Sequence, residues 1–324
     1  MGDVAMIVPV LRAFSQQYPD VNITVLTRVF FTPFFRDLPN VSVFPADLNG
    51  KHKGIFGLFK LSKALKKLNI DAVADLHNVL RTKILKLFLF GKTFIQIDKG
   101  RTEKKALISG NKFEQLKTTH QRYADVFETL GFKLDLSNPT CPERAKLNDK
   151  SRAIVGVDSK KWIGIAPFAT YKSKMYPLDL METVIETLSN TYKVVLFGGG
   201  QKEIEALNIF ENKFDNVISI AGKLSLDEEL DVISNLDVML SMDSGNAHLA
   251  VMLGVKVITI WGVTHPFAGF SSFSQPKDYA LLSDRKQFPL IPTSIYGNKY
   301  PETYIEASRS ILPKTIIEKI ESII

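Results

Sequence analysis

The chain has 324 residues, of which 45% are hydrophobic and 23% are charged, and its formal net charge is +7. This length and balance are typical of a soluble globular protein with two domains, and no apolar run is long enough for a transmembrane helix. The single cysteine, Cys141, excludes an internal disulfide and fits a reducing compartment, and the start of the chain predicts no secretory signal.

The first half alternates helical patterns with short apolar runs. The 3.6-residue periodicity predicts helices over 4–17, 56–69, 78–90 and 118–131. Runs rich in Val and Ile predict strands over 21–27, 41–44, 71–76 and 93–98. Periodicity is lost near 136–160, where Pro, Asn and Lys accumulate, so we place a domain join there.

The second half repeats this alternation. Strands are predicted over 162–167, 192–198, 217–220, 236–242 and 255–261. Helices are predicted over 178–190, 201–213, 226–235 and 245–253. Two such series predict an α/β protein of two doubly wound parallel-sheet domains with a cleft between them. The expected boundaries are 1–150 and 151–312, followed by a C-terminal helix over 313–324, while much of 266–312 is expected to be loop.

The stretch "LSMDSGNAHLAVMLG" (240–254) joins an apolar strand to a helix through Asp243, Ser244 and Gly245. The unpaired N–H groups and partial positive charge of a helix start suit a phosphate. Ser244 can add a hydroxyl, Gly245 permits close approach to the backbone, and His248 can add a donor. The alternative is an ordinary strand–turn–helix junction with a capping residue and a buried histidine. The apolar strand that follows makes the anion site the favoured interpretation.

Two more loops should reach the same edge, because the carboxyl ends of parallel strands meet there. Thr170 and Lys174 follow the first strand of the second half and could contact phosphate. Gly199 and Gly200 follow the next strand and would let a ribose or base lie against the backbone. Glu203 could accept hydrogen bonds from ribose hydroxyls, or it could serve only the dipole of its helix.

Several well-known motifs are absent. No Asp-x-Asp pair is present, which favours a diphosphate site without Mg²⁺, and no His/Cys cluster suggests zinc. The sequence also lacks G-x-G-x-x-G, G-x-S-x-G and Walker A patterns. We therefore expect no metal and no separate cofactor, with the nucleotide entering as part of a substrate.

Three segments carry a family resemblance. The start "GDVAMIVPVLRAFSQQYPDVNITVLT", the sequence "KMYP" at 174–177 and "DSGNAHLA" at 243–250 resemble the lipopolysaccharide heptosyltransferases. These are inverting glycosyltransferases of the GT-B type, with two Rossmann-like domains that face each other across a cleft. The resemblance runs over nearly the whole chain. It implies transfer of heptose or a related sugar from an ADP-sugar to a lipopolysaccharide core acceptor.

The resemblance also implies roles for single residues. Ser244, Gly245 and His248 would surround the diphosphate, Lys174 would contact it, and Glu203 would lie near the ribose. The aspartate of the N-terminal Gly-Asp pair would be the general base, which is Asp3 here. The family has a strand and a Ser-containing loop before this pair, whereas only Met1 precedes Gly2 in this chain. We therefore expect an interrupted first sheet and a natural start roughly ten residues upstream.

The first half is expected to meet an anionic partner. Residues 1–150 contain 24 Lys and Arg against 14 Asp and Glu, whereas the remainder contains 17 against 20. The family acceptor is an anionic glycolipid, which implies a cytoplasmic protein with peripheral contact to the inner membrane. Lys60 and Lys63 could bind the acceptor or lipid, or could be the solvated face of an ordinary helix. His120 and Arg122 could reach acceptor phosphates, or could belong to a core helix.

Two alternatives differ in class from a transferase. A sugar-nucleotide epimerase could use the same fold but would need further acid and base groups. A nucleotide-binding protein without catalysis is the second alternative. No nucleic-acid-binding motif accompanies the positive charge, so we expect no nucleic acid partner. The sequence does not indicate the donor sugar, the acceptor hydroxyl or the oligomeric state.

Overall fold

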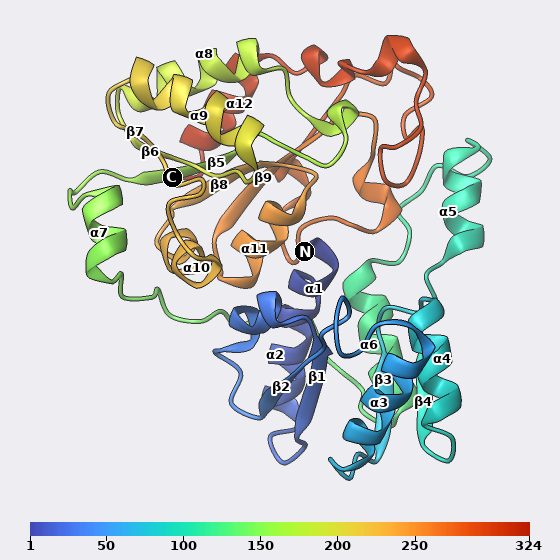
Figure 1. Cartoon of the computed structure of the whole chain (residues 1–324). Coiled ribbons are helices and arrows are strands. Elements are labelled where there is room, and N and C mark those ends of the chain that lie inside the picture. Colours follow the sequence, from blue (N-terminus) through green and yellow to red (C-terminus); the bar gives the residue numbers. More distant parts are fainter. The chain divides into compact units, whose positions relative to one another are not determined.

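The computed structural model describes all 324 residues and divides them into two compact units. The first unit consists of Met1, Asp3–Arg101 and Lys117–Thr140. The second consists of Gly2, Thr102–Leu116 and Cys141–Ile324. Strands and helices alternate in both units, which confirms the predicted α/β class (Figure 1).

The second unit is built on a six-stranded parallel sheet of order β7-β6-β5-β8-β9-β10. The strands are β5 (Trp162–Ala166), β6 (Lys193–Leu196), β7 (Val217–Ser219), β8 (Val238–Met242), β9 (Lys256–Trp261) and β10 (Ala280–Leu282). The chain starts at β5, builds outward to β7, and then returns to the other side of β5 with β8. The order therefore reverses between β5 and β8, and doubly wound sheets bind ligands at such a switch point.

Helices cover both faces of this sheet (Figure 1). One face carries α8, α9 and α12, and the other carries α10 and α11. Because both faces are covered, the strands are continuous apolar runs, and every residue of β8 is buried. The helices are α7 (Asp149–Val155), α8 (Leu178–Ser189), α9 (Gln201–Lys213), α10 (Leu226–Ser234), α11 (Gly245–Met252) and α12 (Pro313–Glu321).

The first unit has two separate parallel strand pairs, β1-β2 and β3-β4, and no strand joins them. The strands are β1 (Ile23–Thr27), β2 (Val41–Pro45), β3 (Ala72–Asp75) and β4 (Thr93–Gln96). This is the interrupted sheet that the family resemblance led us to expect. The helices around it are α1 (Gly2–Ala5), α2 (Ile7–Gln17), α3 (Gly54–Lys66), α4 (Leu80–Phe88) and α6 (Thr119–Thr129).

Two groups of buried apolar side chains stabilise the first unit. In the first, the ring of Phe14 in α2 packs against Phe127 in α6, with ring centroids 4.9 Å apart. The second lies between α3, α4 and the β3-β4 pair, and its buried members are Leu58, Leu61, Leu65, Leu85 and Leu89. Helix α6 also contacts β3 and β4, so it packs against both α2 and the second strand pair.

A segment from the middle of the chain belongs to the second unit. Residues 102–116, with most of α5 (Arg101–Ile108), fold with residues 141–324 and not with their chain neighbours. Leu107 and Leu116 are buried against Ala268, and the backbone N–H of Leu116 donates to the carbonyl of Phe267 over 2.9 Å. From Asp3 onward the chain thus passes between the units three times, whereas the sequence predicted a single join near 150.

The predicted strands and most predicted helices are present. The helix expected over 4–17 is divided into α1 and α2 at Met6, because Pro9 has no N–H to bond to the preceding turn. Three elements lie outside the predicted set, namely α5, α7 and β10, which are short and bury few apolar side chains. No helix of the chain is both long enough and apolar enough to cross a membrane.

Candidate functional site

A buried ion pair lies at the switch point of the second sheet. Lys174 follows β5 and Asp243 follows β8, the two strands on either side of the reversal. The Lys174 Nζ lies 2.8 Å from Asp243 Oδ2, and both side chains are largely shielded from solvent. The hydroxyl of Thr264, after β9, donates to the same Oδ2 over 2.8 Å. Three strand ends thus meet at one carboxylate, which holds the lysine in place.

The Lys174 side chain is also held from the other side. Ser173 is buried, and its Oγ donates to the carbonyl of Gly297 over 2.6 Å, while its own carbonyl accepts from the N–H of Val263. Gly297 has φ of +79°, and a Cβ there would lie 2.6 Å from Cγ of Lys174. The loop that contains Gly297 therefore packs directly on the methylene chain of the lysine.

Helix α11 begins next to this ion pair. Ser244 is its N-cap residue in extended conformation, and its hydroxyl makes no capping bond but lies 3.2 Å from the hydroxyl of Ser241. Gly245 opens the helix, and His248 is buried in its first turn. The first N–H groups of the helix are therefore next to Lys174 and Asp243, and an anion there would meet aligned donors and a cation.

The glycine loop after β6 is held by a hydrogen bond to the first turn of the helix that follows it. The Gly199 N–H donates to Oε2 of Glu203 over 2.7 Å, so this carboxylate shapes the loop at the start of α9. Gly200 is the N-cap residue of the helix. Thr170 is exposed in the loop after β5. The structure brings Lys174, Asp243 and the start of α11 together, whereas Glu203 bonds within its own loop and Thr170 is exposed.

A histidine that the sequence analysis did not single out follows Thr264. His265 is buried, and its Nδ1 accepts from the N–H of Phe267 over 3.2 Å. Burial, with a smaller contribution from Arg285, lowers the pKa of His265 to about 4. The His265 ring packs edge to face on the Phe113 ring. The Arg285 guanidinium lies 3.6 Å from the centre of the Phe113 ring. The position of Thr264 and His265 directly after an apolar strand was the signal that could have identified both.

In the first unit, Asp3 is exposed in the short helix α1. Its carbonyl accepts from the Tyr123 hydroxyl over 3.3 Å, which connects it to α6. Burial lowers the pKa of His77, and the charges of Lys99 and Arg81 act in the same direction, whereas the carboxylates of Asp3 and Asp75 raise it. Asp3 and Asp75 thus lie within electrostatic reach of His77, which follows the carboxyl end of β3.

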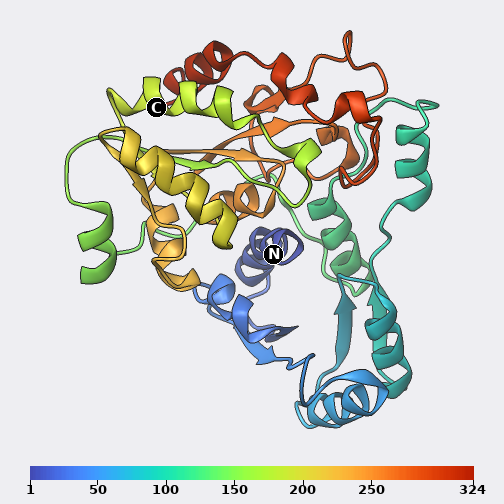
Figure 2. The ribbon, with the colours of Figure 1, turned by 45° about the horizontal axis from the view of Figure 1, so that its top comes forward.

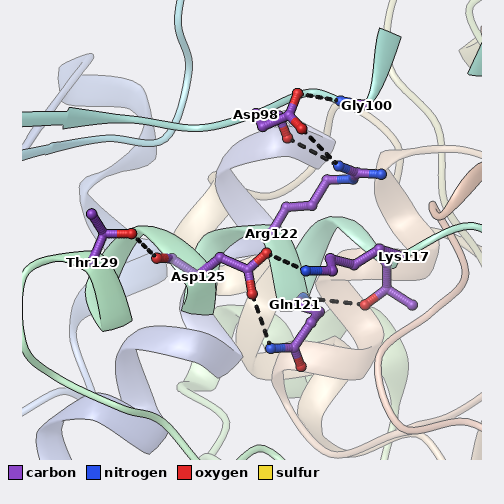
Figure 3. Close-up of polar contacts among 8 residues, drawn as sticks. Asp98, Gly100, Lys117, Gln121, Arg122, Asp125 and Thr129 are labelled. Atoms are coloured by element: carbon purple, nitrogen blue, oxygen red, sulfur yellow. Dashed lines mark hydrogen bonds and ion pairs between the residues drawn. The ribbon is translucent and has the colours of Figure 1, made fainter. Parts of the chain in front are cut away.

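His120 and Arg122 are both buried at the start of α6. The Arg122 guanidinium donates to the Asp98 carbonyl over 3.3 Å and lies 3.7 Å from its carboxylate, beside Gly100 (Figure 3). This arrangement positions the loop after β4. Lys60 and Lys63, by contrast, are exposed on α3.

Comparison with known proteins decides the family. A family model described as glycosyltransferase family 9 (heptosyltransferase) matches residues 58–283. The chain belongs to glycosyltransferase family 9. This heptosyltransferase family acts in lipopolysaccharide synthesis, so the chain is a glycosyltransferase, as predicted, and the epimerase and the non-catalytic alternatives are not retained.

Individual family 9 relatives match over most of their length. Lipooligosaccharide heptosyltransferase 2 of Campylobacter jejuni is 22% identical over 100% of this chain and 96% of its own. Lipopolysaccharide heptosyltransferase 3 of Escherichia coli is 24% identical over 81% of each chain. The relatives thus span both units.

Solved structures of family 9 confirm the GT-B fold. A glycosyl transferase family 9 protein from Veillonella parvula has a TM-score of 0.74 at 19% identity and covers 99% of this chain and 94% of its own. The E. coli heptosyltransferase WaaC with ADP has a TM-score of 0.67 at 18% identity, over 100% of this chain and 97% of its own. Two Rossmann-like domains are therefore the shared architecture.

Proposed function

We propose that this glycosyltransferase transfers heptose or a related sugar from an ADP-sugar to a lipopolysaccharide core acceptor, with inversion and without a metal ion. The observation that carries the proposal is the Lys174–Asp243 ion pair at the switch point, next to the start of α11. The solved relative with ADP supports an adenine nucleotide as the donor's leaving group.

The donor diphosphate would be neutralised by the protein itself. Lys174, which Asp243 holds in place, supplies an ammonium donor, and the N–H groups and partial charge of the α11 start supply further fixed donors. Ser244 adds a hydroxyl, and His248 lies in the same turn. These groups can perform the task that Mg²⁺ performs in enzymes with paired aspartates. Glu203 orders the loop against which the ribose would lie.

In the reaction, Asp3 removes the proton from the acceptor hydroxyl as that oxygen attacks the anomeric carbon. The new glycosidic C–O bond forms as the bond between the anomeric carbon and the diphosphate oxygen breaks. Attack from the face opposite the leaving group inverts the anomeric configuration. The electron pair of the broken bond stays on the departing ADP, whose growing charge is stabilised by Lys174 and α11.

The acceptor would bind the first unit. The excess of Lys and Arg over Asp and Glu in residues 1–150 suits the anionic groups of a lipopolysaccharide core. Lys60 and Lys63 would add attraction for the glycolipid, and we place the protein at the cytoplasmic face of the inner membrane. Arg122 is buried and bonded to Asp98, which favours a role in positioning the loop after β4, and the burial of His120 disfavours direct contact with the acceptor.

The test separates catalysis from donor binding. The variant Asp3→Asn should lower turnover with ADP-heptose and a core acceptor by about a hundredfold or more, the usual contribution of a general base. Its affinity for ADP should remain unchanged, because the base acts on the acceptor. Asp20→Asn, an exposed carboxylate in the same unit, is the control.

Two outcomes would overturn parts of the proposal. Unchanged turnover in Asp3→Asn would remove Asp3 from the mechanism. A thermal-shift titration of the unmodified chain without metal should show stabilisation by ADP over UDP, GDP and CMP. Preference for UDP would contradict the ADP-sugar donor and leave the glycosyltransferase assignment intact.

A further inference from the structure

The loop after β1 leaves two apolar side chains in water at the carboxyl end of that strand. β1 ends at Thr27, and the short 3-10 helix η1 (Val29–Phe35) follows it almost at once. Val29 is 65% exposed, and Phe30 is 57% exposed. Doubly wound folds bind ligands at the carboxyl ends of their strands, and aromatic side chains commonly line such sites. Phe30 is therefore a candidate contact for a ligand of the first unit.

The exposed Phe30 ring is held in a fixed position by a series of aromatic contacts. Phe34 and Phe35, later in η1, are buried and attach this short helix to the first unit. The ring of Phe31 packs on that of Phe34, with centroids 5.5 Å apart. Phe30 meets Phe31 edge to face, with centroids 5.2 Å apart. A ring that is already ordered loses little conformational freedom when a ligand covers it, which favours binding.

Electrostatic contacts place the start of η1 near Asp3, the proposed general base. Burial lowers the pKa of the Met1 amino group, the Asp3 carboxylate raises it, and the Arg28 guanidinium lowers it. Asp3 and Arg28, the N-cap residue of η1, are therefore both within electrostatic reach of one group. Asp3 also acts on His77, which follows the carboxyl end of β3. The carboxyl ends of β1 and β3 thus both lie near Asp3.

The apolar patch of Val29 and Phe30 is small, and its border is polar. Arg28 and Thr32 are exposed beside it, and the Arg28 guanidinium forms no ion pair within the protein. One aromatic side chain buries about 150–250 Å² at most. A stable interface between two proteins buries about 800 Å² on each partner. The patch is therefore too small for a second copy of the chain, and its size suits the apolar face of one sugar ring.

We propose that Phe30 is a platform on which a sugar ring of the acceptor stacks, with Arg28 beside it for an acidic group of the same acceptor. A pyranose ring presents C–H bonds on its faces and hydroxyl groups at its rim. Stacking of one face on Phe30 removes apolar surface from water and leaves a rim hydroxyl free to meet Asp3. The planar guanidinium of Arg28 can donate two parallel hydrogen bonds to a carboxylate or a phosphate.

This inference rests on the proposed function, because it concerns the acceptor of the proposed transfer. The experiment measures transfer from ADP-heptose to a core oligosaccharide from which the acyl chains have been removed. Phe30→Ala should raise the KM for this acceptor by about tenfold, as expected for the loss of an aromatic stacking contact. The kcat and the KM for ADP-heptose should stay within about twofold of those of the unmodified chain. Phe30→Tyr keeps the aromatic face and should keep the acceptor KM.

Phe90 provides the matched control in the same unit. It is 90% exposed, but it lies between α4 and the start of β4, and thus toward the amino ends of the strands. Phe90→Ala should leave the KM for the acceptor unchanged. Because both rings are exposed, Phe30→Ala and Phe90→Ala should both keep the melting temperature of the unmodified chain.

A binding measurement separates the platform from the proposed transfer. Phe30→Trp places an indole at the platform, whereas the natural Trp162 and Trp261 belong to the second unit. Titration with the deacylated acceptor should change the fluorescence of Phe30→Trp and leave that of the unmodified chain constant. This change, found together with a lack of transfer by the unmodified chain, would contradict the proposed function and support the platform.

Four results would overturn the platform. The first is an unchanged acceptor KM in Phe30→Ala while the unmodified chain transfers sugar, which leaves the proposed function intact. The second is constant fluorescence of Phe30→Trp during the titration, and the third is an equal rise of the acceptor KM in Phe90→Ala. The fourth is a rise in KM found only with the acylated acceptor, which would identify an acyl chain as the group that covers Phe30.

Discussion

The two units of this heptosyltransferase-family protein are built from the same kinds of element but bury them to different degrees. In the second unit, six parallel strands form one sheet with helices on both faces, and β8 is buried along its whole length. In the first unit, four strands form two pairs, and β1 alternates between half-buried and exposed residues. A continuous sheet has two edges, whereas two pairs have four, so the first unit leaves more backbone and side-chain surface uncovered.

This difference matches the two tasks that we propose. A donor diphosphate needs donors held in place before it arrives, and the second unit holds Lys174 by Asp243, Thr264 and Gly297. A glycolipid at a membrane needs an accessible basic and apolar surface, and the first unit supplies one on α3 and α4. Under the proposed function, the buried sheet of the second unit would serve the donor, and the exposed surface of the first unit would serve the acceptor.

The largest expected effect is on the free energy of unfolding, and it tests the difference in burial between strands β8 and β1. Leu240→Ala in β8 removes a fully buried side chain and should lower the free energy of unfolding by about 3 kcal/mol. Leu26→Ala in β1 removes one that is 37% exposed and should cost less than about 1 kcal/mol. Circular dichroism during urea unfolding follows the helices of both units and measures both variants, and the fluorescence of Trp162 and Trp261, which both belong to the second unit, identifies the transition of that unit. Equal shifts in the two variants would contradict the comparison.

A smaller effect is expected on the pH dependence of the unfolding free energy, through the buried His265 of the second unit. The pKa of His265 is about 4 in the folded chain and 6.5 when unfolded, so the unfolded state binds more protons between these values. Stability should therefore fall as the pH drops through this window, by about 2 kcal/mol at pH 5 from this group.

His265→Asn removes this titration and keeps an acceptor for the N–H of Phe267. The loss of unfolding free energy between pH 7.5 and pH 5 should thus be smaller in the variant. Glu229, whose pKa burial raises to about 7, contributes with the opposite sign and cancels in the difference. An identical pH dependence in both proteins would show that His265 is accessible to protons in the folded state.

The smallest effect concerns the preformed position of Lys174. Gly297→Ala places a methyl group 2.6 Å from Cγ of Lys174 and should weaken ADP binding by about tenfold. Gly110 has a similar φ of +74° with nothing near its missing Cβ, so Gly110→Ala carries the same backbone strain without the collision. Calorimetry should find ADP binding in Gly110→Ala within about twofold of the unmodified chain. Similar losses in both variants would mean that strain, and not the position of Lys174, controls affinity.

Much of the fold could be predicted from the sequence because it depends on local patterns. Buried parallel strands are apolar runs, and their carboxyl ends share an edge, which led to Lys174 and Asp243. Their ion pair and its third member, Thr264, depend on side-chain packing between distant segments, which periodicity does not report. The same limit applies to His265, whose aromatic neighbour Phe113 comes from another part of the chain.

The sequence also does not predict that the segment 102–116 folds with the second unit, for a related reason. It buries chiefly Leu107 and Leu116, too few apolar residues to indicate which unit it joins. The buried state of His120 and Arg122 was an open alternative, since both residue types are common at binding sites and also at helix starts inside a fold. In each case the local sequence allows both arrangements, and tertiary contacts select one.

That middle segment has a consequence for any attempt to divide the gene. Because residues 102–116 fold with residues 141–324, no single cut separates the two units as contiguous polypeptides. A fragment starting at Cys141 would expose the apolar surface around Ala268 that Leu107 and Leu116 cover. A fragment ending at Thr140 would carry this segment without its partner residues. Dissection of the two activities therefore has to proceed by substitution within the full chain, or by a circularly permuted gene that keeps the three crossings intact.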